Sequence, residues 1–148
     1  MIYTNEPANK FYVLISAARA NLSHEENKKR HFALFTELNQ ARSKYGAIDG
    51  QVIGCYREEG QEVAQEENTI RVLCDTYGQV MQCCKLAGIY DQDCIMVYRS
   101  QTHTASLMFP GGMIGLSSQP LNGSFQEVDK PTGENYTRTV TGRYWEVI

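Results

Sequence analysis

Apolar residues recur at helical spacing in two stretches of the chain. Over residues 24–45 they repeat every three to four positions, while Lys, Glu and Gln occupy the remaining positions, which predicts an amphipathic helix. Asn21 or Ser23 can cap its start, and Gly46 can end it. A second helix is expected over residues 77–87, with a glycine directly after it. The side chains expected to face the core are His31, Phe32, Phe35 and Leu38 in the first helix and Val80, Cys83, Cys84 and Ala87 in the second.

The other apolar segments are short and rich in Val, Ile and aromatic residues, as β-strands are. Strands are expected over residues 11–18, 51–57, 69–74, 94–101, 124–128 and 143–147, with a further short one near Ile114. The order β-α-β-β-α-β, followed by extra C-terminal strands, predicts an α+β fold on the ferredoxin-like plan. We find no linker and no internal repeat, so residues 1–148 are expected to form a single domain.

Both faces of this sheet are predicted to be apolar. In the first strand Tyr12 and Leu14 lie on one face, and Val13 and Ile15 lie on the other. Two helices can cover only one face. The second face is therefore buried either by another subunit or by the C-terminal strands folding back over it, and we expect an oligomer.

Composition narrows the class of partner and the compartment. The formal net charge of −3 is too small to attract nucleic acid. The N-terminal residues lack a signal-peptide pattern, and the chain contains no apolar run long enough to span a bilayer, so we expect a cytoplasmic protein without membrane contact. Five cysteines without a CxxC pair, and only three histidines, favour buried thiols in a reducing compartment over a metal site.

Several common catalytic motifs are missing. The sequence has no GxGxxG after the first strand, no phosphate-binding GxxxxGK[ST], no HExxH and no GxSxG, which disfavours a Rossmann-type methyltransferase or NAD enzyme. His103 could form a nucleophilic pair with Cys55 or Cys94, but inert buried thiols are the preferred interpretation.

Three local groups of polar residues remain as candidates. Glu66 and Glu67 come directly before the strand over 69–74. Because a strand alternates sides, only one of the two carboxylates can face a given pocket, and Glu67 shares the face of Thr69 and Arg71. The alternative is a solvated acidic loop.

The second group is the run Ser-Gln-Thr-His-Thr over residues 100–104, which suits recognition of a purine or ribose or is simply a polar exit from a strand. The third is Gly-Cys-Tyr-Arg-Glu over residues 54–58. Its Tyr56 and Arg57 either contact a ligand or pack and pair on the sheet surface.

Together and in this order, these segments resemble the phage-encoded S-adenosylmethionine-cleaving enzymes, known as SAM hydrolases or SAM lyases. The similar stretches are EPANKFYVLISAARANL (6–22), GCYRE (54–58), EENTIRV (66–72), QDCIMVYRSQTHTA (92–105), GSFQEV (123–128) and GRYWEV (142–147). SQTHTA and GSFQEV are the most specific of these strings, because neither is a general fold pattern.

The resemblance implies a ferredoxin-like trimer similar to the PII signalling proteins, with active sites between subunits and no cofactor or metal. It implies cleavage of S-adenosylmethionine to 5′-methylthioadenosine and L-homoserine lactone. That reaction would deplete the methyl donor of the host cell and act against restriction. The substrate's own carboxylate can attack its γ-carbon, an intramolecular step with a large effective molarity.

By matching motifs, the resemblance also implies roles for particular residues. Glu67 and Tyr56 are the expected catalytic residues, with Glu67 accepting the substrate ammonium and Glu66 as the fallback. Arg57 is expected at the methionine end of the substrate. The adenosine is expected to contact Ser16, Gln101, His103 and Phe125.

Three alternatives stay open at this point. Glu67 could act as a general base on water and give homoserine directly, which would make the protein a hydrolase. The chain could be a non-catalytic PII-like module that binds an adenosine ligand. It could also inhibit a restriction enzyme by direct contact. We favour the lyase route, because the sequence offers no obvious second group to orient a water molecule.

Overall fold

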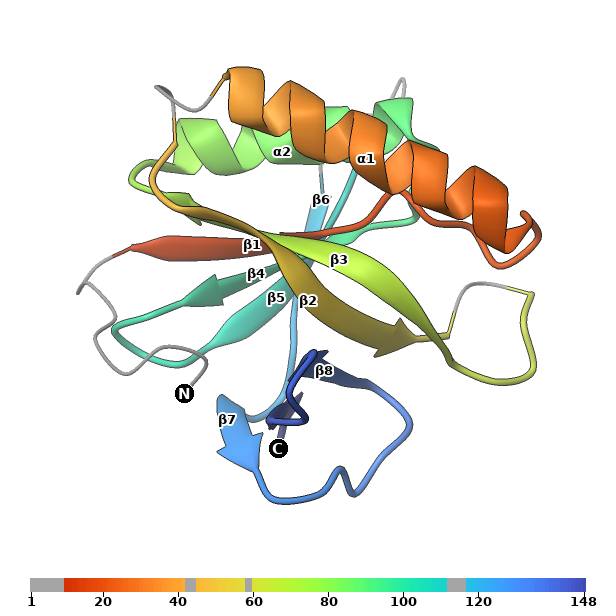
Figure 1. The fold of residues 1–148 in the computed structure, drawn as a ribbon. Helices are drawn as coiled ribbons and strands as arrows, with labels where there is room; N and C mark the ends of the chain where they lie inside the picture. The colour runs from red at the N-terminus through yellow and green to blue at the C-terminus, as the bar shows by residue number, and fades with distance from the viewer. Residues whose placement is uncertain (1–9, 42–44, 58–59, 112–116) are drawn as a thin grey trace.

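The computed structural model describes residues 10–41, 45–57, 60–111 and 117–148. Within them the chain forms two helices and one curled antiparallel sheet, which confirms the α+β class. Both helices lie on one face of the sheet, and the C-terminal strands lie below the opposite face (Figure 1). We call this opposite face the concave face.

The elements are β1 (Phe11–Ile15), α1 (His24–Gln40), β2 (Ile48–Tyr56), β3 (Gln65–Cys74), α2 (Tyr77–Ile89), β4 (Ile95–Arg99), β5 (Ala105–Phe109), β6 (Ser117–Pro120), β7 (Phe125–Val128), β8 (Tyr136–Thr139) and β9 (Tyr144–Val147). In the described residues the sheet has nine strands in the order β6-β5-β4-β1-β3-β2-β8-β9-β7. Its four central strands therefore run in the order β4-β1-β3-β2.

Local capping fixes where both helices begin. Ser23 caps α1, since its side chain accepts a hydrogen bond from the backbone N–H of Glu26. Thr76 and Gln79 form a reciprocal capping box at the start of α2. The expected core stripe of α2 is buried as predicted, but the helix runs through Gly88 to Ile89 rather than ending before it. The first helix ends at Gln40, earlier than expected.

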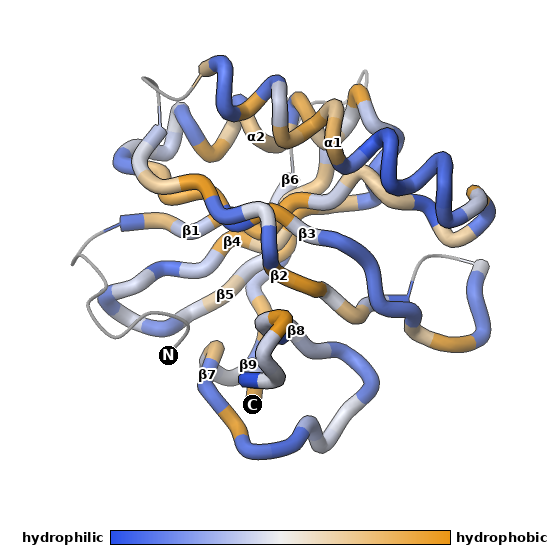
Figure 2. The backbone as a smooth tube through the Cα atoms, viewed as in Figure 1, coloured by the Kyte–Doolittle hydropathy of each residue, from blue (hydrophilic) through white to orange (hydrophobic). Residues whose placement is uncertain are grey.

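The core between helices and sheet is aliphatic and includes thiols. Val13, Ile15 and Ile70 of the sheet pack against Leu34 of α1 and Val80 of α2, and all five are almost fully buried. The hydrophobic parts of the chain converge at this boundary in Figure 2. Phe32 was expected to join them, but it is 71% exposed, so that expectation was wrong. It lies two residues from Leu34, about 200° away around the helix, and therefore points away from the core.

A second hydrophobic cluster fills the concave face. Tyr12 and Met96 of the central strands are buried there together with Phe125 of β7 and Trp145 of β9. The C-terminal strands thus fold back over part of the face that we expected another subunit to cover. The oligomeric state itself stays a prediction.

The strand boundaries differ from expectation around the polar motifs. β3 begins at Gln65, so Glu66 and Glu67 lie inside it and pair with Cys55 and Gly54 of β2. The hydrogen-bonded pairing reaches these residues because β2 and β3 form one long hairpin. β4 ends at Arg99, and the run over 100–104 is the turn that leads into β5.

Three strands, β5, β6 and β8, were not expected. The short strand expected near Ile114 lies outside the described residues. Neither helix in the described part of the chain is long and apolar enough to cross a membrane.

Candidate active site

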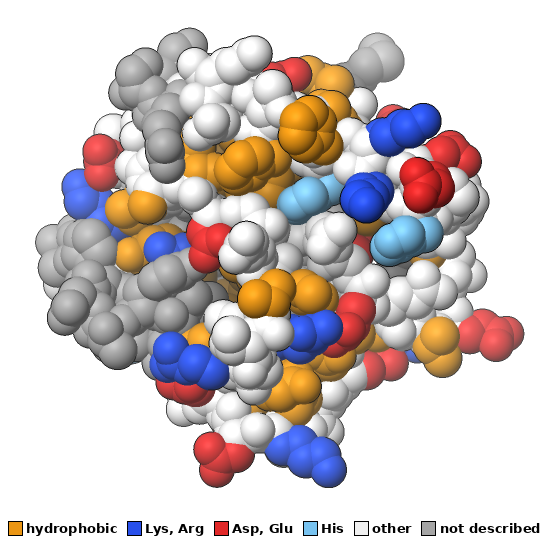
Figure 3. Space-filling model, viewed as in Figure 1, with side chains coloured by type: hydrophobic (Ala, Val, Ile, Leu, Met, Phe, Trp, Pro, Cys, Tyr) orange, Lys and Arg blue, Asp and Glu red, His pale blue; other side chains and the backbone are white. Residues whose placement is uncertain are grey.

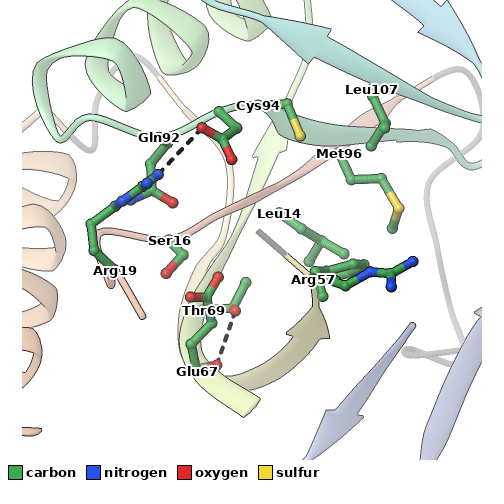
Figure 4. A pocket seen from close by; sticks show the side chains of 12 residues that line it. Leu14, Ser16, Arg19, Arg57, Glu67, Thr69, Gln92, Cys94, Met96 and Leu107 are labelled. Carbon is green, nitrogen blue, oxygen red and sulfur yellow. Dashed lines mark hydrogen bonds and ion pairs between the residues drawn. The ribbon is translucent and has the colours of Figure 1, made fainter. Parts of the chain in front are cut away.

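A cavity of about 120 Å³ opens on the concave face, at the end of the sheet where β1 and β2 finish and β3 and β4 begin. Side chains from five strands and three loops line it (Figure 4). We call it the Glu67 pocket. Its lining residues are Leu14, Ser16, Arg19, Tyr56, Arg57, Glu67, Thr69, Gln92, Asp93, Cys94, Met96 and Leu107.

Four of the expected site residues meet in this pocket: Ser16, Tyr56, Arg57 and Glu67. They come from separate segments of the sequence. The sheet brings them together because β3 lies between β1 and β2.

Ser16 directly follows β1 and is 7% exposed. Its hydroxyl donates to the backbone oxygen of Asn68 at 3.0 Å and accepts from the N–H of Ala18 at 3.0 Å. These bonds fix the exit of β1 against β3, so Ser16 shapes the floor of the pocket.

Tyr56 ends β2, and its ring lies across Gly54. A Cβ atom at Gly54 would come within 2.8 Å of this ring. The Tyr56 hydroxyl shares a hydrogen bond of 2.7 Å with Thr137 of β8. Burial raises the pKa of Tyr56 to about 12, although the bond to Thr137 acts in the opposite direction. The phenol therefore stays neutral near pH 7 and can serve as a hydrogen-bonding group, not as a phenolate base.

Glu67 projects from β3 on the same face as Thr69, as strand alternation predicted, and both line the pocket. The Thr69 hydroxyl donates to the backbone oxygen of Glu67 at 3.2 Å. Figure 4 shows the Glu67 carboxylate on the same side of the pocket as Ser16. Glu67 is only half-buried, so a ligand can reach its carboxylate from the pocket.

Glu66 points to the other side of β3 and does not line the Glu67 pocket. Its carboxylate accepts from Arg138 at 2.7 and 3.0 Å and from the Tyr136 hydroxyl at 2.6 Å. The hydrogen bonds from Arg138 hold the pKa of Glu66 below its usual value, although burial opposes them. Its contacts therefore attach β8 to β3.

The other three expected residues lie apart from this pocket. Gln101 is exposed in the turn between β4 and β5. His103, in the same turn, shares a 3.0 Å hydrogen bond between its Nδ1 atom and the Tyr98 hydroxyl. Its backbone oxygen accepts from the N–H of Phe125 at 2.8 Å, and the Phe125 ring lies 4.9 Å from that of Tyr98. His103 and Phe125 thus attach the C-terminal strands to the β4–β5 turn.

Sequence reasoning missed the charged wall opposite Glu67. Arg19 pairs with Asp93 at 3.3 Å and donates to the backbone oxygen of Asp91 at 2.9 Å. Both Arg19 and Asp93 lie in stretches that we matched to the phage enzymes. No local spacing joins them, since they are far apart in sequence.

The thiols near the site are unsuited to nucleophilic catalysis. Burial raises the pKa of Cys94 to about 11, and it also raises the pKa of Cys55. Both therefore stay protonated near neutral pH. Among the described residues, no three His, Cys, Asp or Glu side chains gather as metal ligands.

The pocket combines charges of both signs with an apolar wall. Glu67 and Asp93 supply carboxylates, and Arg19 and Arg57 supply guanidinium groups. Leu14, Met96 and Leu107 form the apolar part. Such a lining suits a small ligand that carries an ammonium, a carboxylate and an apolar linker.

These features describe a small α+β protein with a small pocket of mixed charge at the end of a curled sheet. The chain matches the S-Adenosylmethionine lyase family over residues 13–148. It is also 43% identical over 151 aligned residues to the S-Adenosylmethionine lyase of Enterobacteria phage T3, and the alignment covers 99% of each chain. The chain therefore belongs to the S-adenosylmethionine lyase family, which confirms the resemblance found in the sequence.

Proposed function

We propose that this protein is an S-adenosylmethionine lyase that releases 5′-methylthioadenosine and L-homoserine lactone. The observation that carries the proposal is the mixed-charge Glu67 pocket in a chain of this family. A carboxylate oxygen of the substrate forms a bond to its own γ-carbon as the bond from that carbon to sulfur breaks. The electron pair moves to sulfur and neutralises the sulfonium, and no proton is transferred.

The pocket residues favour this reaction by holding the methionine end in a folded conformation. Glu67 accepts hydrogen bonds from the ammonium and keeps it away from the attacking carboxylate. The neutral Tyr56 hydroxyl, braced by Thr137, limits the conformations of the chain near the reacting carbon. The apolar wall of Met96 and Leu107 excludes water from the carboxylate, which raises its reactivity.

The same proposal includes a ferredoxin-like, PII-like trimer formed from single domains of residues 1–148. The central strand order β4-β1-β3-β2 supports the ferredoxin-like plan. An open groove supports a subunit contact, and its lining includes Phe32, Lys28, Gly50 and Gln51. Phe32 is 71% exposed there. In addition, β8 pairs with β2 only over residues 52–55, so the strand edge at residues 50 and 51 is not covered by β8. Figure 3 shows hydrophobic side chains beside Lys and His residues on this side of the molecule.

The groove also lies close to the candidate site. Lys28 and Asn68 line both the groove and a neighbouring cavity that Glu67 lines as well. A subunit seated in the groove would thus lie beside the Glu67 pocket, as active sites between subunits require. Light scattering at micromolar concentration tests this part of the proposal, and a monomeric mass contradicts it. In the host cytoplasm the trimer would deplete S-adenosylmethionine and so weaken restriction that depends on it.

The decisive experiment is to incubate the purified protein with S-adenosylmethionine in ¹⁸O-labelled water and to analyse early products by mass spectrometry. The lyase reaction gives methylthioadenosine and unlabelled homoserine lactone. Later opening of the lactone by acyl attack places the label in the carboxyl group. Direct hydrolysis with Glu67 as base would instead place the label in the γ-hydroxyl of homoserine from the first time point. Intact substrate after long incubation overturns catalysis and leaves a binding module.

A further inference from the structure

A second cavity adjoins the Glu67 pocket on the concave face. It measures about 270 Å³, and Tyr56, Met96 and Leu107 line both spaces. The two cavities therefore meet at these three residues. Together they fall within the range of about 300–1,000 Å³ that is typical of ligand sites, whereas the Glu67 pocket by itself is too small.

A buried indole forms part of the wall of the second cavity. Trp145 lines it and is 1% exposed. Within the described part of the chain, the buried indole nitrogen of Trp145 has no hydrogen-bond partner. A buried indole N–H usually finds an acceptor, because leaving it unpaired costs about 1–3 kcal/mol. Because this nitrogen is fully buried, an acceptor atom on a ligand would supply the missing bond once the indole turns its N–H toward the cavity.

Other residues around the cavity offer surfaces for a flat ring. Phe125 lines the cavity and is held in place by its ring contact with Tyr98 and by the backbone bond to His103. Leu121 and Val147 add apolar area. Aromatic and aliphatic walls of this kind favour stacking of a heteroaromatic ring.

Two carboxamides complete the polar complement of the cavity. Asn122 and Asn135 line it, and the amide group matches the donor and acceptor pattern of adenine, N6 and N7. The turn that precedes Asn135 is fixed by the buried carboxylate of Glu146, which accepts from the Thr132 N–H at 3.1 Å and from the Thr132 hydroxyl at 2.8 Å. These bonds therefore hold the backbone that leads to Asn135 in place.

We propose that this cavity, which we call the Trp145 cavity, binds the purine base of the substrate. The inference rests on the proposed function and adds the location of the base to it. The base lies among Phe125, Trp145 and the two amides. The sulfonium lies where the cavities meet, and the amino-acid end reaches Glu67. The expected adenosine contacts change accordingly, since His103 supports Phe125 from outside the cavity and Gln101 lies in the exposed turn beside it.

The chain provides its own reporter, because Trp145 is the single tryptophan of the sequence. We expect a saturable change in tryptophan emission on titration with 5′-methylthioadenosine or adenosine, and no change with L-methionine. Cleavage of S-adenosylmethionine without any emission response overturns the purine assignment while the lyase proposal stands. An emission response without cleavage overturns the lyase proposal and leaves the purine site.

Two variants tie the signal to this cavity. Asn122→Ala and Asn135→Ala should each raise the KM for S-adenosylmethionine about tenfold, change kcat less than about threefold, and weaken methylthioadenosine binding by the same factor as KM. Asn39→Ala, on the exposed surface of α1, serves as the control and should alter none of these values. If both cavity variants keep the KM and the titration midpoint of the wild type, the base binds elsewhere and the proposal is wrong.

Discussion

The two faces of the sheet bury different kinds of side chain. Under the helices the buried cluster is aliphatic with a few thiols, as at Val13, Leu34 and Cys83. On the concave face, buried polar groups such as Arg71 and Thr137 lie among aromatic rings, and the Arg71 guanidinium lies 4.0 Å from the centre of the Tyr12 ring. Burying polar groups is costly unless they are paired. Here Thr137 bonds to the Tyr56 hydroxyl and Arg71 lies over the Tyr12 ring. The contrast indicates that the helical face mainly buries apolar side chains, while the concave face also holds the polar groups that support the site.

The largest expected effect lies on the helical face and concerns stability alone. Leu34 is fully buried, so Leu34→Ala should lower the free energy of unfolding by about 3 kcal/mol through the lost transfer energy and the cavity left behind. The kcat/KM of the fraction that remains folded should equal that of the wild type. Denaturant titration followed by assay checks both. Met81→Ala, at a position 36% exposed on α2, is the control and should cost much less. A loss of kcat/KM in folded Leu34→Ala would contradict the division between the faces.

At Glu67 we expect the opposite result, a loss of activity without a loss of stability. Glu67→Gln removes the charge that accepts the substrate ammonium, so kcat/KM for S-adenosylmethionine should fall about 100-fold while the unfolding midpoint stays close to that of the wild type. Initial-rate kinetics and circular dichroism measure the two quantities. Glu66→Gln is the matched comparison on the other side of the strand. A larger loss in Glu66→Gln than in Glu67→Gln would exchange the roles of the two carboxylates.

A smaller effect should follow from crowding the Tyr56 ring. In Gly54→Ala the new Cβ would lie 2.8 Å from both the Tyr56 ring and the Thr69 hydroxyl, so Tyr56 has to move. We expect kcat to fall about tenfold, because displacement of about 1 Å at a reacting centre is costly. Gly133→Ala is the control, since apart from its chain neighbours no atom of the described residues lies within 4 Å of the added carbon. Equal rates for the two variants would show that the position of Tyr56 is unimportant.

The smallest effect concerns the link between β8 and β3. Since Arg138 lowers the pKa of Glu66 in the folded chain, this carboxylate adds stability above the pKa of the unfolded chain, about 4.3. That stability is lost as the pH falls through the lower folded value. The unfolding midpoint of the wild type should exceed that of Glu66→Gln slightly near pH 7, and the two should converge in acid. Because the pair is partly exposed, salt should also reduce the difference. If the difference between the two midpoints persists at pH 2, it arises from packing and not from the ion pair.

The parts of the structure that sequence could predict are those fixed by local rules. Capping by Ser23, the buried stripe of α2, and the orientation of Glu67 toward the face of Thr69 all follow from spacing within one element. Similarity to a known family then predicted Tyr56 and Glu67 as the catalytic residues.

Other features depend on contacts between distant segments. The residues of β6 are all exposed, so no apolar alternation marks it. The pair of Arg19 and Asp93 joins two loops, and only the folded sheet brings them to the same pocket. Trp145 looked like part of an ordinary terminal strand, and its unpaired indole emerges only once β9 is placed on the concave face.

The order in which the two clusters are completed along the chain has a consequence for synthesis. Among the described residues, the helical-face cluster extends only as far as Met108, whereas the concave cluster needs Phe125 and Trp145 to pack on Tyr12. Contacts of such high sequence separation form slowly. A ribosome adds roughly 5–20 residues per second, so the nascent chain passes through a stage in which the helices are docked and the aromatic side is still open. We expect such intermediates to bind chaperones through this open side, and cleavage to begin only after the last strand has docked.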